Sequence, residues 1–125
     1  LLDRFGFWLA PEAGRFSETG PALPFDQHFL KALIAPRALL CTEALQDLWA
    51  NPQGSWLTHV AAQPVFDLCG ASRHNAIAFR DGGHAHTLAD WCSLLDFADA
   101  VFSDADLPEG FNRGPYPDLP SAWTR

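Results

Sequence analysis

The chain has 125 residues, with 15 acidic against 8 basic side chains and a formal net charge of -7. This balance argues against a protein that binds nucleic acid or an anionic membrane surface, because both need a clustered basic face and the Lys and Arg residues here are scattered. Hydrophobic residues make up 48% and charged residues 18%, which is typical of a folded globular chain rather than a disordered one. The length favours a single domain.

The first part of the chain predicts an irregular segment, a short helix and a strand. Residues 1–24 are rich in aromatic, Pro and Gly residues without a regular period, which predicts a loop with room for one helical turn. Apolar residues then follow at helical spacing behind Asp26, a favourable N-cap, and Pro36 closes this segment. The compact apolar run 38–42 predicts a strand that is buried on both faces.

The next part predicts a second helix and a second strand. Residues 43–52 are polar and predict a loop, and a helical spacing of apolar residues follows from Trp56 to Leu68, bent or interrupted at Pro64. Residues 75–80 have the pattern of a second strand, which a Gly-containing turn ends.

The last predicted helix is the best defined element. Thr87 and Asp90 have the spacing of a capping box, and an amphipathic pattern continues from there to Phe102. Because of their helical positions, we expect Trp56 and Trp91 to be core residues. Residues 103–125 are polar and rich in Pro, so we divide the chain into an α/β part, 1–102, and an irregular tail, 103–125.

The alternation of helices and strands predicts an α/β fold with a parallel sheet. Two strands do not make a complete sheet, because strands of this kind are covered on both faces and pair on both edges in finished domains. We therefore expect the chain to be the end of a larger α/β fold.

Chemically versatile residues lie in the two loops that follow the predicted strands. Asp47 follows the first strand, and His84, preceded by two glycines, follows the second. An acid and then a histidine in this order is the second half of the Ser, Asp/Glu, His sequence of α/β-hydrolases, in which the carboxylate orients the imidazole. From these residues alone, a solvated loop carboxylate or a helix-start charge is the favoured interpretation of Asp47. His84 and His86 lack a third ligand cluster, so we expect no metal and no cofactor.

Several short motifs, in a fixed order, carry a sharper resemblance. They are Leu23-Pro24-Phe25-Asp26-Gln27-His28, Ala32-Leu33-Ile34-Ala35-Pro36-Arg37, Asp47-Leu48-Trp49-Ala50-Asn51-Pro52 with Gly54, Gly82-Gly83-His84 and Asp90-Trp91. Over roughly residues 5–102, the sequence resembles the C-terminal portion of the glucuronoyl esterases (4-O-methyl-glucuronoyl methylesterases). These carbohydrate esterases cleave the ester that joins 4-O-methyl-glucuronic acid on xylan to lignin alcohols.

This resemblance implies a fold, a site and a substrate. The fold is the C-terminal part of an α/β-hydrolase three-layer sandwich, with its last two parallel strands and their flanking helices. By the same resemblance Asp47 is the triad acid, His84 is the triad histidine, and Trp49 forms an aromatic wall that packs on the sugar. A glucuronoxylan-type carbohydrate ester is then the substrate of the complete enzyme, and a secreted or periplasmic location is expected.

The sequence also departs from the family pattern. The nucleophile of the family lies in an upstream Gly-x-Ser-Arg-x-Gly elbow, and this sequence holds no such motif. The stretch from Gly70 to His74 contains Ser72 but lacks the final Gly and follows a helix, so we interpret it as a coincidental loop. In some relatives the acid sits on an earlier strand, which leaves a second interpretation for Asp47.

Without a nucleophile we expect this chain by itself to be inactive as an esterase. Two alternatives stay open beside the esterase interpretation. One is an inactive fragment, in which Asp47 and His84 are relics. The other is a noncatalytic carbohydrate-binding or interaction module that uses Trp49 and the aromatic N-terminal segment.

Overall fold

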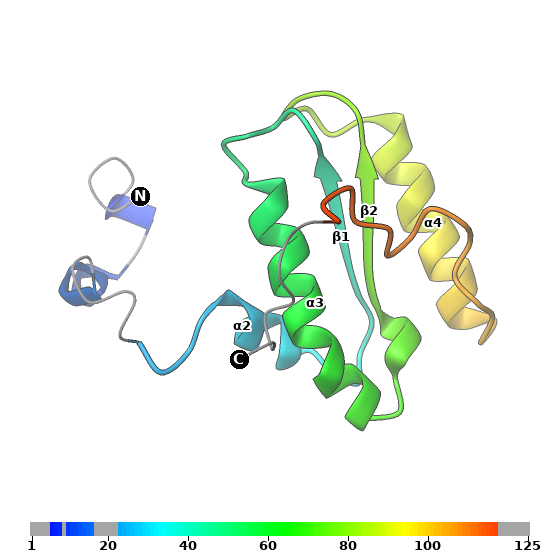
Figure 1. The fold of residues 1–125 in the computed structure, drawn as a ribbon, viewed down its shortest axis with the longest axis horizontal. Helices are drawn as coiled ribbons and strands as arrows, with labels where there is room; N and C mark the ends of the chain where they lie inside the picture. Colours follow the sequence, from blue (N-terminus) through cyan, green and yellow to red (C-terminus); the bar gives the residue numbers. More distant parts are fainter. Residues whose placement is uncertain (1–5, 9, 17–22, 118–125) are drawn as a thin grey trace.

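The structure is a computed structural model that describes residues 6–8, 10–16 and 23–117. Its centre is a strand-helix-strand-helix unit: β1 (Leu39–Ala44), α3 (Pro52–Leu68), β2 (Asn75–Arg80) and α4 (Leu88–Phe102) (Figure 1). The short helix α2 (Gln27–Ala32) precedes β1, and the 3-10 turn η4 (Ser72–His74) leads into β2. Two further 3-10 turns, η1 (Gly6–Trp8) and η2 (Pro11–Phe16), lie apart from the sheet (Figure 1).

The two strands are parallel, as the sequence predicts. They pair in register from Leu39 opposite Asn75 to Ala44 opposite Arg80. Helix α3 packs on one side of the strand pair and α4 on the other (Figure 1). β1 is longer than predicted, because Glu43 and Ala44 continue the ladder opposite β2 instead of opening a loop. Both strands therefore end at the same edge of the sheet, and the loops that follow them meet there (Figure 1).

The helices begin at side chains that satisfy free backbone N–H groups. Asp26 accepts a hydrogen bond from the Gln27 N–H at 2.6 Å, as predicted for α2. Helix α3 begins at Pro52, before the predicted start, because Asn51 caps the Gly54 N–H at 3.1 Å and proline suits a first helical position. Pro64 lies within α3 without ending it. None of the helices in the described ranges has the length and apolar character needed to cross a membrane.

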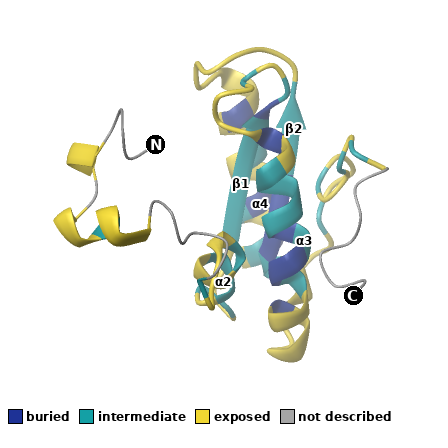
Figure 2. Cartoon of the chain, turned by 60° about the vertical axis from the view of Figure 1, so that its left-hand side comes forward, coloured by how far each residue is buried: buried dark blue, intermediate teal, exposed yellow. Residues whose placement is uncertain are grey.

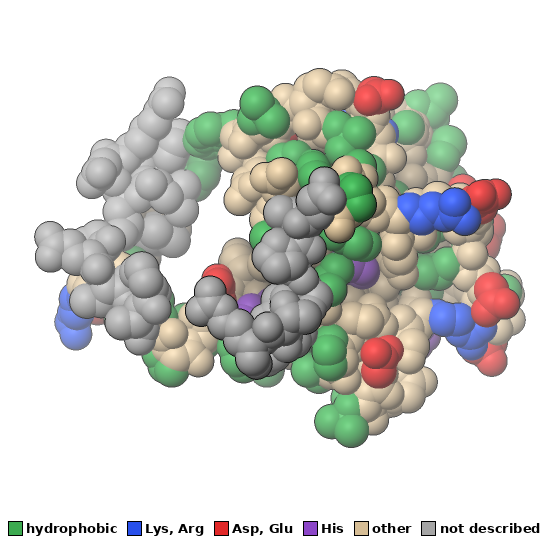
Figure 3. Space-filling model, viewed as in Figure 1, with side chains coloured by type: hydrophobic (Ala, Val, Ile, Leu, Met, Phe, Trp, Pro, Cys, Tyr) green, Lys and Arg blue, Asp and Glu red, His purple; other side chains and the backbone are tan. Residues whose placement is uncertain are grey.

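The core lies between α3 and the strand pair, where the buried positions of Figure 2 gather. Its fully buried residues include Phe66 on α3 and Ile77 on β2. Trp91 is 54% exposed, so its predicted place in the core is wrong for this chain. Phe97 and Ala100 are the buried hydrophobic residues of α4, whereas Trp91 and other apolar residues of this helix stay exposed on a face that no described element covers. Hydrophobic side chains accordingly remain on the surface (Figure 3).

The outer edge of β2 is covered by the segment that follows α4. Phe111 forms an isolated antiparallel bridge with Ala78. Asn112 accepts from the Ile77 N–H through Oδ1 at 2.9 Å, and its own N–H donates to the Ile77 carbonyl at 2.9 Å. Residues 103–117 form no helix or strand, yet they contribute these contacts to the sheet. No strand in the described ranges pairs with the outer edge of β1.

Candidate active site

Asp47 and His84 meet at the carboxyl ends of the two parallel strands. Asp47 lies three residues after β1 and His84 four residues after β2. Asp47 Oδ2 is 2.7 Å from His84 Nδ1. The Asp47 side chain is 12% exposed and the imidazole is 80% exposed. The two residues predicted from the strand-end loops are therefore in hydrogen-bond contact, with the carboxylate sheltered and the imidazole open to solvent.

The Asp47 carboxylate is fixed by the tight turn that carries it. The Asp47 N–H donates to the Ala44 carbonyl at 3.1 Å, and the Ala50 N–H donates to the Asp47 carbonyl at 3.0 Å. The second carboxylate oxygen, Oδ1, accepts from the same Ala50 N–H at 3.4 Å. This arrangement leaves Oδ2 directed at the imidazole.

Gln46 joins the two loops to each other. Its backbone N–H donates to the Gly82 carbonyl at 3.1 Å, and its side-chain oxygen accepts from the Gly82 N–H. Its side-chain amide also donates to Asp81 Oδ1 at 3.2 Å. These three bonds fix the spacing between the Asp47 loop and the His84 loop.

The turn before His84 requires glycine at position 82. Gly82 has φ +110°, a conformation that side chains rarely adopt, and a Cβ there would lie 3.1 Å from Arg80 Nη1. Gly82 thus lets the chain reverse closely over the end of β2. The reversal brings His84 back towards the Asp47 loop.

Arg80, the last residue of β2, forms hydrogen bonds to backbone carbonyls of the loop that carries His84. Its guanidinium donates to the Asp81 carbonyl at 3.1 Å, to the Gly83 carbonyl at 3.4 Å and to the Ala85 carbonyl. Its Nε donates to Asp90 Oδ2 at 2.7 Å. One side chain thereby links β2, the loop and the start of α4.

Asp90 is nearly fully buried, with 3% of its side chain exposed. Burial raises the pKa of this carboxyl, but the Thr87 backbone and hydroxyl hydrogen bonds and the Arg80 ion pair more than offset it and lower the pKa to about 2. The Thr87 N–H and hydroxyl donate to Oδ2 at 2.7 and 2.9 Å. Asp90 is therefore ionised at neutral pH and completes the predicted capping box of α4.

Trp49 lies on the same loop as Asp47, two residues further along. Trp49 is 62% exposed, and Leu48, which precedes it in the sequence, is exposed as well. The Asp47 loop therefore presents an aromatic and an aliphatic side chain at the end of the sheet that holds His84. An exposed indole next to a polar pair is a suitable surface for stacking on a ring.

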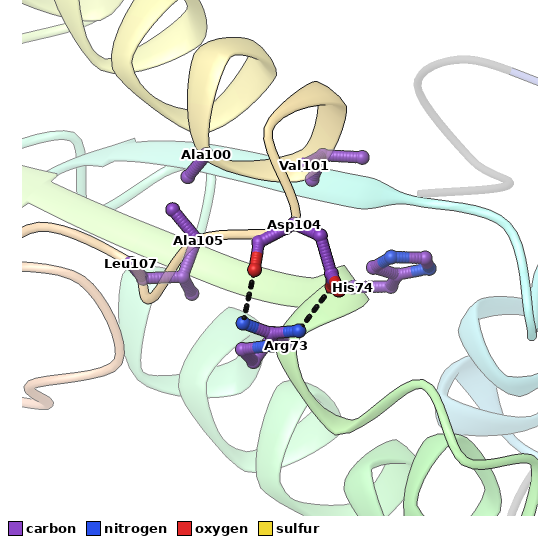
Figure 4. A pocket seen from close by; sticks show the side chains of 7 residues that line it. All are labelled: Arg73, His74, Ala100, Val101, Asp104, Ala105 and Leu107. Carbon is purple, nitrogen blue, oxygen red and sulfur yellow. Dashed lines mark hydrogen bonds and ion pairs between the residues drawn. The ribbon is translucent and has the colours of Figure 1, made fainter.

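Ser72 lies at the opposite end of the sheet. It belongs to the turn η4, which leads into the amino end of β2, whereas His84 follows the carboxyl end. The six-residue strand between them spans about 20 Å. Ser72 is therefore out of reach of His84, in agreement with its interpretation as a coincidental loop residue. A small hollow at this opposite end is lined by Arg73 and Asp104, which form an ion pair with each other (Figure 4).

Sequence reasoning missed the residues that support the pair. Gln46 joins loops that follow different strands, whereas Arg80 and Asp90 meet across the loop between β2 and α4. Neither the Gln46 contacts nor the Arg80–Asp90 pair has a local sequence pattern. Two signals pointed to Asp90: its capping-box spacing with Thr87 and its place in the Asp90-Trp91 motif. In the part of the chain that the structure describes, no group of three or more His, Cys, Asp or Glu side chains is arranged to hold a metal ion.

The sequence is similar to known carbohydrate esterases. A family profile described as "Glucuronyl esterase, fungi" matches residues 4–70, more than half of the chain. A 4-O-methyl-glucuronoyl methylesterase from Phanerochaete chrysosporium is 37% identical over 79 residues, covering 63% of this chain and 16% of that protein. A carbohydrate esterase from an unknown prokaryotic organism is 31% identical over 110 residues, covering 76% of this chain and 26% of that protein.

Solved structures of the same kind resemble the fold. A family 15 carbohydrate esterase, a glucuronoyl esterase from Caldicellulosiruptor kristjansonii, aligns with a TM-score of 0.75 and 38% identity over 82% of this chain and 27% of its own. The glucuronoyl esterase catalytic domain from Hypocrea jecorina aligns with a TM-score of 0.59 and 26% identity over 86% of this chain and 32% of its own. The prediction of the C-terminal part of an α/β-hydrolase is thus confirmed.

The chain spans 16% and 26% of the two curated relatives described above and about a third or less of the two solved structures. The profile match includes Asp47 and Trp49, and the structural alignments extend over most of the strand-helix unit that carries the site. Sequence and structure therefore agree on one assignment. The chain belongs to the glucuronoyl esterase family.

Proposed function

We propose that this chain supplies the acid and the histidine of a serine-type esterase that cleaves glucuronate esters. The observation that carries the proposal is the 2.7 Å contact between Asp47 Oδ2 and His84 Nδ1 at the carboxyl ends of two parallel strands. Open α/β sheets place their ligands at this edge. Ser72 lies at the other end of the sheet, so the nucleophilic serine comes from a part of the complete fold that this sequence does not contain.

The geometry gives each side chain a role. Asp47 accepts the Nδ1 proton of His84, which leaves Nε2 as the unprotonated base and stabilises the cation that forms when Nε2 is protonated. His84 removes the proton from the serine hydroxyl while the serine oxygen bonds to the ester carbonyl carbon. The bond to the alcohol oxygen then breaks, and His84 returns the proton to that oxygen. In the second half of the reaction His84 removes a proton from water while the water oxygen bonds to the acyl carbon. The bond to the serine oxygen then breaks, His84 returns the proton to that oxygen, and the uronate is released.

Trp49 fits the position of a wall for the sugar ring in the same proposal. Its exposure and its position two residues after Asp47 support this role. The relatives are described as 4-O-methyl-glucuronoyl methylesterases, and a glucuronoxylan-type ester is the substrate that we propose here. Since such a polymer stays outside the cell membrane, we place the enzyme in a secreted or periplasmic location.

Joining the chain to a complementary part of the fold tests the activity. The portion of the Caldicellulosiruptor kristjansonii enzyme that precedes the aligned region is fused to this chain, and hydrolysis of the benzyl ester of glucuronic acid is measured. We expect turnover in the fusion and none in the chain alone. Asp47→Asn and His84→Gln should each lower kcat by about 10^3 to 10^4-fold, and Trp49→Ala should mainly raise KM.

Arg73→Ala is the matched control, because Arg73 forms its ion pair with Asp104 at the far end of the sheet. This variant should keep the kcat and KM of the unmodified fusion. A folded fusion whose activity is unaffected by His84→Gln would refute the proposed role of the pair. Folding is checked by the thermal transition of each variant.

The exposed Trp49 and Leu48 also favour a second candidate, a noncatalytic carbohydrate-binding module. It predicts that the chain alone binds glucuronoxylan and that Trp49→Ala abolishes binding, with no dependence on His84. Titration of the chain with glucuronoxylan, followed by tryptophan fluorescence, separates the two candidates. Binding that is lost in Trp49→Ala, together with an inactive fusion, would favour the module.

A further inference from the structure

We infer that Arg80 and Asp90 are positioning residues for His84, which together hold its loop so that the imidazole stays on Asp47. This inference rests on the proposed function, because it assigns a role towards the same histidine. It concerns two side chains that do not contact the reacting atoms.

The contacts of Arg80 surround His84 in the sequence. The guanidinium binds the carbonyl of Gly83 on one side of His84 and the carbonyl of Ala85 on the other. It also binds the Asp81 carbonyl at the start of the same turn. One rigid cation thus holds the peptide group that precedes His84 and the one that follows Ala85, which limits the movement of the short segment that carries His84.

Asp90 supplies the fixed point for that cation. Arg80 Nε donates to Asp90 Oδ2 at 2.7 Å, and Thr87 donates to the same oxygen from its N–H and its hydroxyl. The carboxylate is buried at the first turn of α4, and 16% of the Arg80 side chain is exposed. The loop that carries His84 is thereby attached to the first turn of α4.

This support matters because His84 has little packing of its own. Its imidazole is 80% exposed, so neighbouring side chains do little to restrict its rotation, and the bond to Asp47 must outweigh the entropy of fixing the ring. In a catalytic site a displacement of about 1 Å can cost about 100-fold in rate. Because Arg80 already restrains the backbone before and after His84, the imidazole loses less conformational entropy when it binds Asp47.

The geometry also distinguishes Arg80 from a general structural cation. Its planar fork reaches carbonyls of three residues while Nε remains on the carboxylate. A lysine carries the same charge at a single point and cannot make these bonds together. Arg80→Lys therefore keeps the charge but removes the hold on the loop.

Exchange of the His84 Nδ1 proton with water measures this hold directly in the 125-residue chain. Long-range 15N-edited NMR should show the proton on Nδ1 in the unmodified chain. We expect Arg80→Lys and Asp90→Asn to speed its exchange about tenfold, as the loss of one net hydrogen bond would. Protection of the β1 and β2 amides should persist in Arg80→Lys. This second readout separates a loosened loop from an unfolded chain.

Two further variants complete the design. Arg73→Lys makes the same chemical change at the far end of the sheet and should leave the exchange rate unaltered. Asp47→Asn should abolish the His84 signature while the Arg80 Nε proton stays protected on Asp90, since that bond does not involve Asp47.

The outcomes separate this inference from the proposed function. If folded Arg80→Lys exchanges the His84 Nδ1 proton at the same rate as the unmodified chain, the inference is overturned and the esterase proposal stays intact. An unmodified chain with no proton on Nδ1 overturns both. Slower exchange in the unmodified chain than in Arg80→Lys, combined with an inactive fusion enzyme, supports the positioning role and refutes the esterase.

Discussion

The Asp90 carboxylate should make the chain sensitive to acid in a narrow range of pH. Its pKa is lowered from an ordinary value of 3.8 to about 2 in the folded state. A group of this kind stabilises the fold fully above its unfolded pKa, and the contribution is lost as the pH falls through the folded pKa. The window therefore lies between about pH 4 and pH 2.

The magnitude follows from the shift in pKa. One pKa unit corresponds to about 1.4 kcal/mol, so the shift of Asp90 contributes about 2 kcal/mol to the free energy of unfolding at neutral pH. Asp90→Asn keeps the shape of the side chain and removes its charge. We expect this variant to be less stable by about that amount at pH 7 and to approach the unmodified chain near pH 2.

Urea unfolding followed by tryptophan fluorescence measures both proteins at a series of pH values. The difference between the two free energies isolates Asp90 from the other carboxylates, because those titrate in both proteins. Asp96→Asn is the control, since it removes one charge from an exposed position of the same helix. A difference between the unmodified chain and Asp90→Asn that stays constant from pH 7 to pH 2 would refute the reasoning.

Three further substitutions test the loop, the sheet edge and the core by urea unfolding. Gly82→Ala forces a side chain into a φ of +110° and should destabilise the fold by about 1–3 kcal/mol; an unchanged midpoint would contradict the strain argument. Asn112→Ala leaves the Ile77 N–H without its acceptor and should cost about 1–3 kcal/mol, with faster amide exchange at Ile77. Phe66→Ala opens a cavity at a fully buried position and should cost about 3–5 kcal/mol, whereas Leu68→Ala, 88% exposed, should stay within about 0.5 kcal/mol.

Elements with strong local patterns could be predicted from the sequence. Asp26 does cap α2, residues 75–80 do form a strand, and Thr87 with Asp90 does open α4. The meeting of Asp47 and His84 followed from one rule, that parallel strands end at the same edge of a sheet. In each case the information lies within a few neighbouring residues or in the order of the elements.

Features that depend on distant partners were not predictable. β1 continues to Ala44 because β2 offers backbone partners opposite it, and the apolar run that marks the strand stops earlier. Trp91 occupies a helical position of core type, yet nothing in the described ranges covers that face of α4. Arg80 looks like an ordinary charged strand end until the turn brings three carbonyls around its guanidinium.

Because Phe111 and Asn112 cover part of the outer edge of β2, the two edges of the strand pair differ in their capacity to bind a further strand. Asn112 takes up the Ile77 N–H and carbonyl that an added strand would use, while β1 keeps a row of such groups unpaired by any described strand. Addition of a strand is therefore favoured next to β1 and obstructed next to β2. Two copies of the unit could join edge to edge through β1, whereas Phe111 and Asn112 oppose the same pairing at β2, so strand pairing of this folded unit favours a dimer over a fibril.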